Sequence, residues 1–271
     1  YGKFFENVKK NLFVKHPYKH TTIGEMDHLD AASLEEFLAF NKKYYVPNNA
    51  ILVVAGDIQI DATKKMIADY FGAIPKGADV NRVAEKEDPI TEAIEAKAYD
   101  SNIQIPAVVA AYRMPSIKTR DSKVLDMIST YLSDGNSSKL YRKMVDEKKM
   151  ALQVGAFNVS QEDYGMYLIF GLPLGDTSLK SIITEIDEEV VKIQEDLISE
   201  KDYQKLQNKF ETNFVDSNSS VEGIANSLAE YYAFYRDTNL INSEIEIYRS
   251  ISREEIQAVA KKYLNPNQRL V

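Results

Sequence analysis

The segment SREEIQAVAKKYLNPNQRLV at residues 252–271 repeats the segment SLEEFLAFNKKYYVPNNAIL at residues 33–52. The ungapped pairing keeps nine identities at a constant offset of 252 − 33 = 219 residues. In each copy a serine precedes a helical pattern, a proline follows it and a short apolar run comes next, which predicts a helix and then a strand. We therefore expect a unit of this size to occur twice, with the front of the first copy absent from the 271 residues.

Composition indicates ordinary globular material with room for two domains. The chain is 44% hydrophobic and 27% charged, and its formal net charge is −8. Because nucleic-acid binding usually requires a basic face, we expect no nucleic-acid partner. The longest strongly apolar run, Ala50–Ala55, is far shorter than the roughly 20 residues that span a bilayer, so we expect no membrane span. The absence of cysteine excludes disulfides and thiolate zinc sites. The compartment stays open between a bacterial periplasm or cell envelope and the cytoplasm.

The first part of the chain reads as helices around one buried strand. Apolar spacing predicts helices over 4–13 and 61–71, and Ser33 with Glu36 forms a capping-box pattern at the start of a helix that ends before Pro47. The apolar, β-branched run Ala50–Asp57 predicts a strand. Residues 76–98 are charged and poor in large apolar side chains, which is typical of a linker.

The second part predicts an α+β domain. A strand at 103–113 precedes the other expected elements, which are two helices, an antiparallel hairpin, a series of long helices and a final strand. Their ranges are helices 121–132 and 137–145, strands 151–159 and 164–172, and helices 178–197, 199–216, 221–235 and 245–263. Helices segregated against a mostly antiparallel sheet favour an α+β fold over a doubly wound one.

The residues themselves offer weak candidates for chemistry. His16 and His20 lie four residues apart and His28 follows, so they could bind zinc, but Pro17 interrupts a common helix face and surface histidines beside a turn explain the pattern better. The pairs Glu35/Glu36 and Glu254/Glu255 could supply an acid and a base, yet a first helical turn favours negative charge in any case.

Other catalytic patterns are not found. The GNSS turn at residues 135–138 matches no phosphate-binding motif, and the sequence has no nucleophile elbow. Individual residues and short motifs therefore give no basis for assigning an enzymatic activity.

A family resemblance does emerge from longer stretches. TTIGEMDHLDAASLEEFLAFNKKYYVPNNAILVVAGDI at 21–58, YFGAIP at 70–75 and GNSSKLYRKMVDEKKMALQVGAF at 135–157 resemble the insulinase-type M16 zinc peptidases. The resemblance covers almost the whole chain. It implies a two-domain, LuxS/M16-like α+β architecture built from paired homologous domains, with 1–75 as the end of a truncated first domain, 76–98 as a linker and 99–271 as the second domain.

The family's zinc motif, H-x-x-E-H with a distant glutamate, is absent from this sequence. By the resemblance, the helix that carries this motif is the first-copy counterpart of the expected helix 121–132. Subtracting the offset of 219 residues therefore places it before Tyr1. We accordingly expect no catalytic residue, no metal ligand and no zinc in this chain itself, and zinc only in the intact parent. Substrate-binding residues stay unknown.

Active halves of the family also carry an arginine and a tyrosine seven residues apart. The matching positions here hold Val145 and Leu152, and Arg142 lies three residues too early to take the role. The resemblance therefore implies a fragment of a zinc metalloendopeptidase that is inactive alone, with a peptide substrate and a homologous M16 subunit or domain as partners. The alternative is a non-catalytic M16-like scaffold or substrate-binding subunit.

Overall fold

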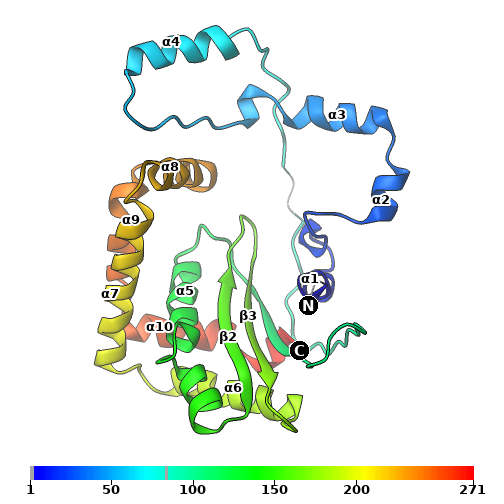
Figure 1. The fold of residues 1–271 in the computed structure, drawn as a ribbon, viewed down its shortest axis with the longest axis vertical. Coiled ribbons are helices and arrows are strands. Elements are labelled where there is room, and N and C mark those ends of the chain that lie inside the picture. The colour runs from blue at the N-terminus through cyan, green and yellow to red at the C-terminus, as the bar shows by residue number, and fades with distance from the viewer. Residues whose placement is uncertain (1–2, 83–84) are drawn as a thin grey trace. The chain divides into compact units, whose positions relative to one another are not determined.

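The computed structural model describes residues 3–82 and 85–271, and the chain forms two compact units (Figure 1). The sheet unit combines Tyr1–Thr21, Glu85–Glu211 and Ile245–Val271, and the helical unit combines Thr22–Ala84 and Thr212–Glu244. These units are defined by contacts. The boundaries expected above, at 1–75, 76–98 and 99–271, are defined by homology and stay a prediction.

A four-stranded antiparallel sheet in the order β2-β3-β1-β4 forms the centre of the sheet unit. Its strands are β1 Val108–Met114, β2 Ala151–Val159, β3 Gly165–Pro173 and β4 Arg269–Leu270. The expected hairpin is present as β2 and β3, while the strand expected from residue 103 begins only at Val108. The mixture of helices and antiparallel sheet confirms the α+β prediction.

Alternating side chains of the strands build a core on each face of the sheet. Ala110, Tyr112 and Met114 of β1 join the larger core, whereas Ala111 joins the smaller one. This is the two-residue period of a strand that is buried on both faces. Helices α5 (Arg120–Ser133), α6 (Leu179–Glu195) and α10 (Arg253–Tyr263) contribute to the larger core, and α1 (Phe4–Leu12) covers the smaller one.

Local sequence signals explain where these helices begin. Thr119, Ser178 and Ser252 each accept a hydrogen bond from a backbone N–H of the first turn. The single helix expected over 245–263 is divided into α9 (Leu240–Arg249) and α10, because Ser252 caps a new helix. Where a helix was expected over 137–145, the structure has a π-helical segment, η3 (Tyr141–Glu147), which continues two residues past the predicted end.

The helical unit contains α2 (Met26–Ala31), α3 (Leu34–Tyr44), α4 (Ile60–Phe71) and α8 (Val221–Tyr235). Helix α7 (Glu200–Ser217) and α9 each belong partly to both units. Short 3₁₀ turns lie at η1 (Pro17–Lys19), η2 (Pro47–Asn49) and η4 (Pro266–Gln268). Among the described residues, no helix combines the length and apolarity that a membrane crossing requires.

The repeat is visible in local structure. Helices α3 and α10 both have 11 residues, and their first residues differ by 253 − 34 = 219. The turns η2 and η4 keep the same offset, since 266 − 47 = 219. The predicted capping box of α3 is present: Ser33 Oγ accepts from the Glu36 N–H at 3.2 Å, and the Ser33 N–H donates to Glu36 Oε2 at 2.8 Å.

The prediction of a strand over Ala50–Asp57 is wrong, because the structure has no strand there. Most of the segment is exposed, and its residues join no ladder. A strand needs a neighbouring strand for its backbone groups, and an apolar pattern cannot supply one. The second copy of the pattern does have such a neighbour, since β4 pairs with β1.

Candidate functional site

A polar row crosses the face of the sheet that packs against α5, α6 and α10. Asn158 of β2 lies opposite Tyr167 of β3, Tyr167 lies opposite Tyr112 of β1, and Tyr112 lies opposite Arg269 of β4. Tyr112, Tyr167 and Arg269 are buried. Because buried polar groups are costly unless they are paired, this row is the first place to look for chemistry.

Arg269 is fully engaged at one end of the row. Its guanidinium forms a two-point ion pair with Asp187 of α6, with Nη2 2.9 Å from Oδ2, and Nη1 donates to the Tyr112 hydroxyl at 3.1 Å. Burial raises the pKa of Tyr112 and outweighs the opposing effect of Arg269. Both groups therefore keep their ordinary charge at neutral pH and fasten β4 and α6 to the sheet.

Asp126 of α5 closes the other end of the row. Asn158 Nδ2 donates to Asp126 Oδ1 at 3.0 Å, and the Tyr248 hydroxyl donates to Oδ2 at 3.2 Å. Burial raises the pKa of Tyr167 well above its usual value, so this phenol stays neutral. The Asp126 carboxylate accepts hydrogen bonds on both oxygens, which makes it a structural acceptor rather than a free base.

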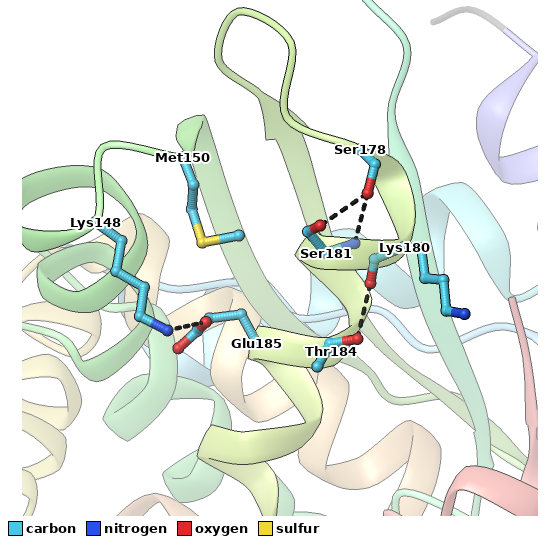
Figure 2. Close-up of a pocket in the computed structure, with 7 residues that line it drawn as sticks. All are labelled: Lys148, Met150, Ser178, Lys180, Ser181, Thr184 and Glu185. Atoms are coloured by element: carbon cyan, nitrogen blue, oxygen red, sulfur yellow. Dashed lines mark hydrogen bonds and ion pairs between the residues drawn. The ribbon is translucent and has the colours of Figure 1, made fainter.

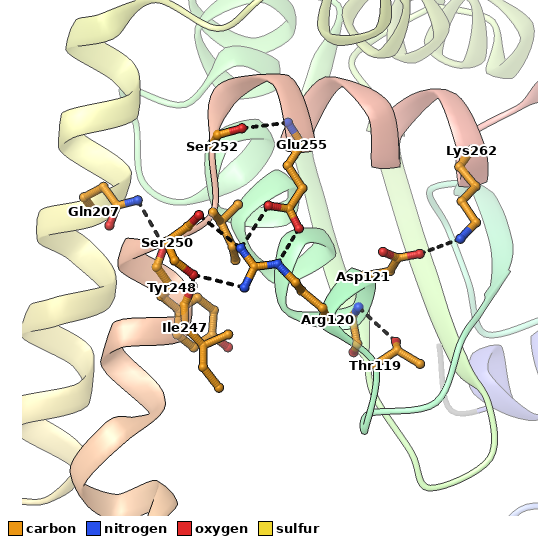
Figure 3. A network of polar contacts seen from close by, with 12 residues as sticks. Thr119, Arg120, Asp121, Gln207, Ile247, Tyr248, Ser250, Ser252, Glu255 and Lys262 are labelled. Carbon is orange, nitrogen blue, oxygen red and sulfur yellow. Dashed lines mark hydrogen bonds and ion pairs between the residues drawn. The ribbon is translucent and has the colours of Figure 1, made fainter.

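The first turn of α5 is bound to α10 by the network shown in Figure 3. Arg120 forms a two-point ion pair with Glu255, at 2.5 and 2.9 Å, and also donates to the Ser250 carbonyl at 3.0 Å. Asp121 accepts from Lys262 Nζ and from the Tyr263 hydroxyl, each at 2.7 Å. Burial would raise the pKa of Asp121, but these two donors lower it overall. The carboxylate considered above as an acid or base, Glu255, thus joins two helices.

The three histidines occupy different environments. His16 is buried, with Nε2 3.2 Å from Asp163 Oδ2 and Nδ1 accepting from the Tyr18 N–H at 3.2 Å, so its description as a surface histidine is wrong. The signal was missed because Asp163 is 147 residues away in sequence. His20 and His28 are exposed. Within the described residues no group of three or more metal-binding side chains is present, so they do not fit a zinc centre.

Glu87 carries a buried carboxylate that the sequence analysis missed, because it lies in the expected linker. It lies in the charged run EKED at residues 85–88, within the expected linker, yet its side chain is only 2% exposed. One oxygen accepts the backbone N–H groups of three consecutive residues, Val14, Lys15 and His16, at 2.6–2.9 Å. The other oxygen lies 3.1 Å from Arg113 Nη2. This clamp joins the start of the chain to β1.

The two positions that match the family's arginine and tyrosine, 145 and 152, hold apolar side chains in apolar or half-exposed surroundings. Val145 is partly buried against the larger core, and Leu152 lies half-exposed on β2. Arg142 is exposed and pairs with Glu147 at 3.5 Å. Positions 145 and 152 therefore supply neither the guanidinium nor the phenol that an active half of the family carries there.

An open depression of about 560 Å³ lies beside the start of α6 (Figure 2). Its polar groups serve the local fold: Ser178 caps α6, Thr184 donates to the Lys180 carbonyl, and Lys148 pairs with Glu185. The depression is lined by Lys148, Met150, Ser178, Lys180, Ser181, Thr184 and Glu185. We assign it no reaction.

Comparison with known proteins identifies the family. The family model described as "Peptidase M16 inactive domain" matches residues 31–210, more than half of the chain. The zinc protease PqqE of Helicobacter pylori is 25% identical over 271 residues, 99% of this chain and 60% of the relative. An uncharacterized zinc protease of Rickettsia felis is 21% identical and covers 97% of this chain and 61% of the relative. The chain thus spans about 60% of the length of these relatives.

Solved structures show the same fold. A protease from Helicobacter pylori matches with a TM-score of 0.90 and 24% identity, covering 99% of this chain and 65% of that chain. The peptidase M16 inactive domain from Pseudomonas fluorescens matches with a TM-score of 0.81 and 15% identity, covering 97% and 63%. From the family match we conclude that this chain belongs to the M16 peptidase family, as an inactive-domain fragment of a zinc protease-like protein.

Proposed function

We propose that this chain is the non-hydrolytic part of an M16 zinc peptidase, in which it forms one wall of a chamber for unfolded peptides. In this proposal the parent protein hydrolyses peptide bonds, and zinc and the catalytic residues come from elements outside these 271 residues. No catalytic step is assigned to a side chain of this chain.

Helix α5 carries the proposal. The resemblance makes α5 the counterpart of the helix that holds the zinc motif in an active domain. Here α5 has no histidine, and its two aspartates, Asp121 and Asp126, each accept two hydrogen bonds from neighbouring side chains. Such a helix is suited to holding its domain together and unsuited to binding a metal.

The test uses the full-length parent and a fluorogenic unfolded peptide. We expect zinc-dependent hydrolysis that increases when a homologous subunit bearing the Arg/Tyr pair is added, because Val145 and Leu152 offer no hydrogen-bond donor of that kind. Loss of one such donor typically costs about 100-fold to 1000-fold in rate. Full turnover by the parent alone, unchanged by the second subunit, would contradict this division of labour.

The alternative function is a scaffold or substrate-binding subunit, and the same positions favour it. If the parent lacks both a zinc motif and the Arg/Tyr pair, it would bind peptides without cleaving them. Peptide binding measured by fluorescence anisotropy, combined with no hydrolysis at saturating zinc and with the second subunit present, would favour this alternative.

A further inference from the structure

The segment that leads into β2 has two unusual backbone features next to each other. The first is η3 (Tyr141–Glu147), because π-helical turns are rare and often lie at functional positions. The second is Lys149, whose left-handed backbone, with φ of +50°, is one that residues other than glycine rarely adopt. A regular α-helix would need neither feature, so contacts made by this segment must favour the observed arrangement.

Two backbone hydrogen bonds define the wide turn. The Lys148 N–H donates to the Lys143 carbonyl oxygen, five residues back, and the Met150 N–H donates to the Met144 carbonyl oxygen, six residues back, each at 2.9 Å. Residues five apart are therefore about one turn apart here. In an α-helix, which advances about 100° per residue, residues five apart point in directions that differ by about 140°.

The carboxylate of Glu185 on α6 uses this wide spacing. Glu185 is buried, its Oε1 lies 2.7 Å from Lys143 Nζ, and its Oε2 pairs with Lys148 Nζ. Figure 2 shows Lys148 reaching this carboxylate beside Met150. Both ammonium groups reach one carboxylate because the wide turn places them on the same side of the segment. Glu185 thus joins the two ends of the turn.

Two neighbouring carboxylates of α6 contact the segment differently. Lys143 Nζ also lies 3.3 Å from Glu188 Oε2 and 3.2 Å from Glu189 Oε1. Within the described residues, Lys148 pairs with Glu185 and with neither of these two. Glu188 and Glu189 therefore hold Lys143 to α6 without fixing its distance from Lys148.

We propose that residues 141–150 form a two-state element, in which the negative charge of Glu185 selects the π-helical state over an α-helical one. In the α-helical state Lys148 points away from Glu185. Lys149 then leaves the left-handed region, and Met150 loses its hydrogen bond to the preceding turn. Because Lys148, Met150 and Glu185 all line the depression beside α6, the change of state remodels that depression.

Neutralisation of Glu185 is the trigger that this arrangement favours. Burial alone would raise the pKa of Glu185, but its hydrogen bonds to Lys143 and Lys148 lower that pKa overall. A carboxyl group with a lowered pKa keeps its contribution above its usual pKa of about 4.3 and loses it as the pH falls through the lowered value. The π-helical state should therefore persist at neutral pH and give way in acid. The charged groups around Glu185 are Lys143, Lys148, Lys180, Glu188, Glu189 and Lys192.

The experiment compares three variants of the 271-residue chain at neutral pH. Glu185→Gln removes the charge, and Lys148→Met removes one of its two partners. Glu188→Gln is the matched control, since it makes the same chemical change on the same helix and removes a contact of Lys143 alone. Because the Lys148 side chain is 46% exposed, Lys148→Met leaves the core intact and decides the question even if Glu185→Gln unfolds the chain.

Two measurements report the state of the segment. Hydrogen exchange of the Met150 N–H should become about 10-fold faster or more in Glu185→Gln and Lys148→Met, and change by less than about 2-fold in Glu188→Gln. The Cα chemical shift of Lys149 in NMR spectra should leave the left-handed range in the first two variants only. The unsubstituted chain should show the same two changes when it is acidified.

A Lys148→Met variant that keeps the left-handed shift of Lys149 would overturn the proposal. Equal effects of Glu188→Gln and Glu185→Gln would also overturn it, because the link between two lysines would then have no special role. The inference is independent of the proposed function, since neither measurement requires a peptide or zinc.

Discussion

Glu87→Gln should loosen the beginning of the chain from the sheet unit. The glutamate uses one oxygen for the N–H groups of Val14, Lys15 and His16 and the other for Arg113. Glutamine keeps one acceptor and replaces the other with an NH₂ group that cannot accept a hydrogen bond. Either the three amides or Arg113 must then face a donor, inside a site where the carboxylate is 2% exposed.

The magnitude follows from the contacts that are lost. A hydrogen bond to a charged group contributes about 1.5–3 kcal/mol, and removing one partner of a buried ion pair costs about 3–5 kcal/mol. Arg113 keeps the carbonyl oxygens of Leu12 and Asp88 as acceptors, so we place the cost near the lower end, at about 2–3 kcal/mol. The opening free energy of the three amides, measured by hydrogen exchange at pH 7, gives this quantity directly.

The pH dependence provides a second check. Burial alone would raise the pKa of Glu87, but the three amides and Arg113 outweigh it, so its pKa lies below the usual value. A carboxyl group with a lowered folded-state pKa contributes stability that is fully present above its unfolded pKa of about 4.3 and is lost as the pH falls through the folded pKa. The difference in opening free energy between the unsubstituted chain and Glu87→Gln should therefore shrink below about pH 4.3.

Glu85→Gln is the matched control, since it makes the same chemical change two residues away at an exposed position. Its effect on the three amides should be within about 0.5 kcal/mol. The reasoning would be refuted if Glu87→Gln cost less than about 0.5 kcal/mol at pH 7. A cost that persisted unchanged at low pH would refute the electrostatic part of it.

Three further changes test other parts of the molecule. Arg269→Met leaves Asp187 and Tyr112 without their guanidinium partner and should lower the free energy of unfolding in urea by about 2–4 kcal/mol. Adding Asp187→Asn should recover part of that loss. If the effects of the two substitutions simply add, the ion pair does not contribute to stability. Gly171→Ala places a methyl group 2.5 Å from Ile182 Cγ2 and should cost about 1–3 kcal/mol in the same assay, so a neutral result would show that the core relaxes there. Calorimetric titration of the chain with zinc at pH 7 should show no tight stoichiometric site, because His16 uses both ring nitrogens internally; one tightly bound zinc per chain would contradict this.

Much of the fold was accessible from sequence where the signals are local. Ser33 and Ser252 mark helix starts through bonds to residues three positions away, and the β2–β3 hairpin joins neighbouring alternating runs. The assignment of Glu255 to a structural role was also accessible, since a carboxylate in a first helical turn has an ordinary explanation. The break before Ser252 within the expected helix 245–263 was missed although it has a sequence signal, because Ser252 and Glu255 repeat the capping pattern of Ser33 and Glu36.

Sequence by itself determined the repeat, its offset of 219 residues and the helix that opens each copy. Tertiary structure alone decided the pairings over long separations, such as His16 with Asp163 and the Glu87 clamp beside Arg113. It also decided that residues 269–270 are a strand while residues 50–51 are not, although their sequences follow the same pattern. The physical reason is that a strand and a buried carboxylate are each defined by groups distant in sequence, which supply hydrogen bonds and exclude water.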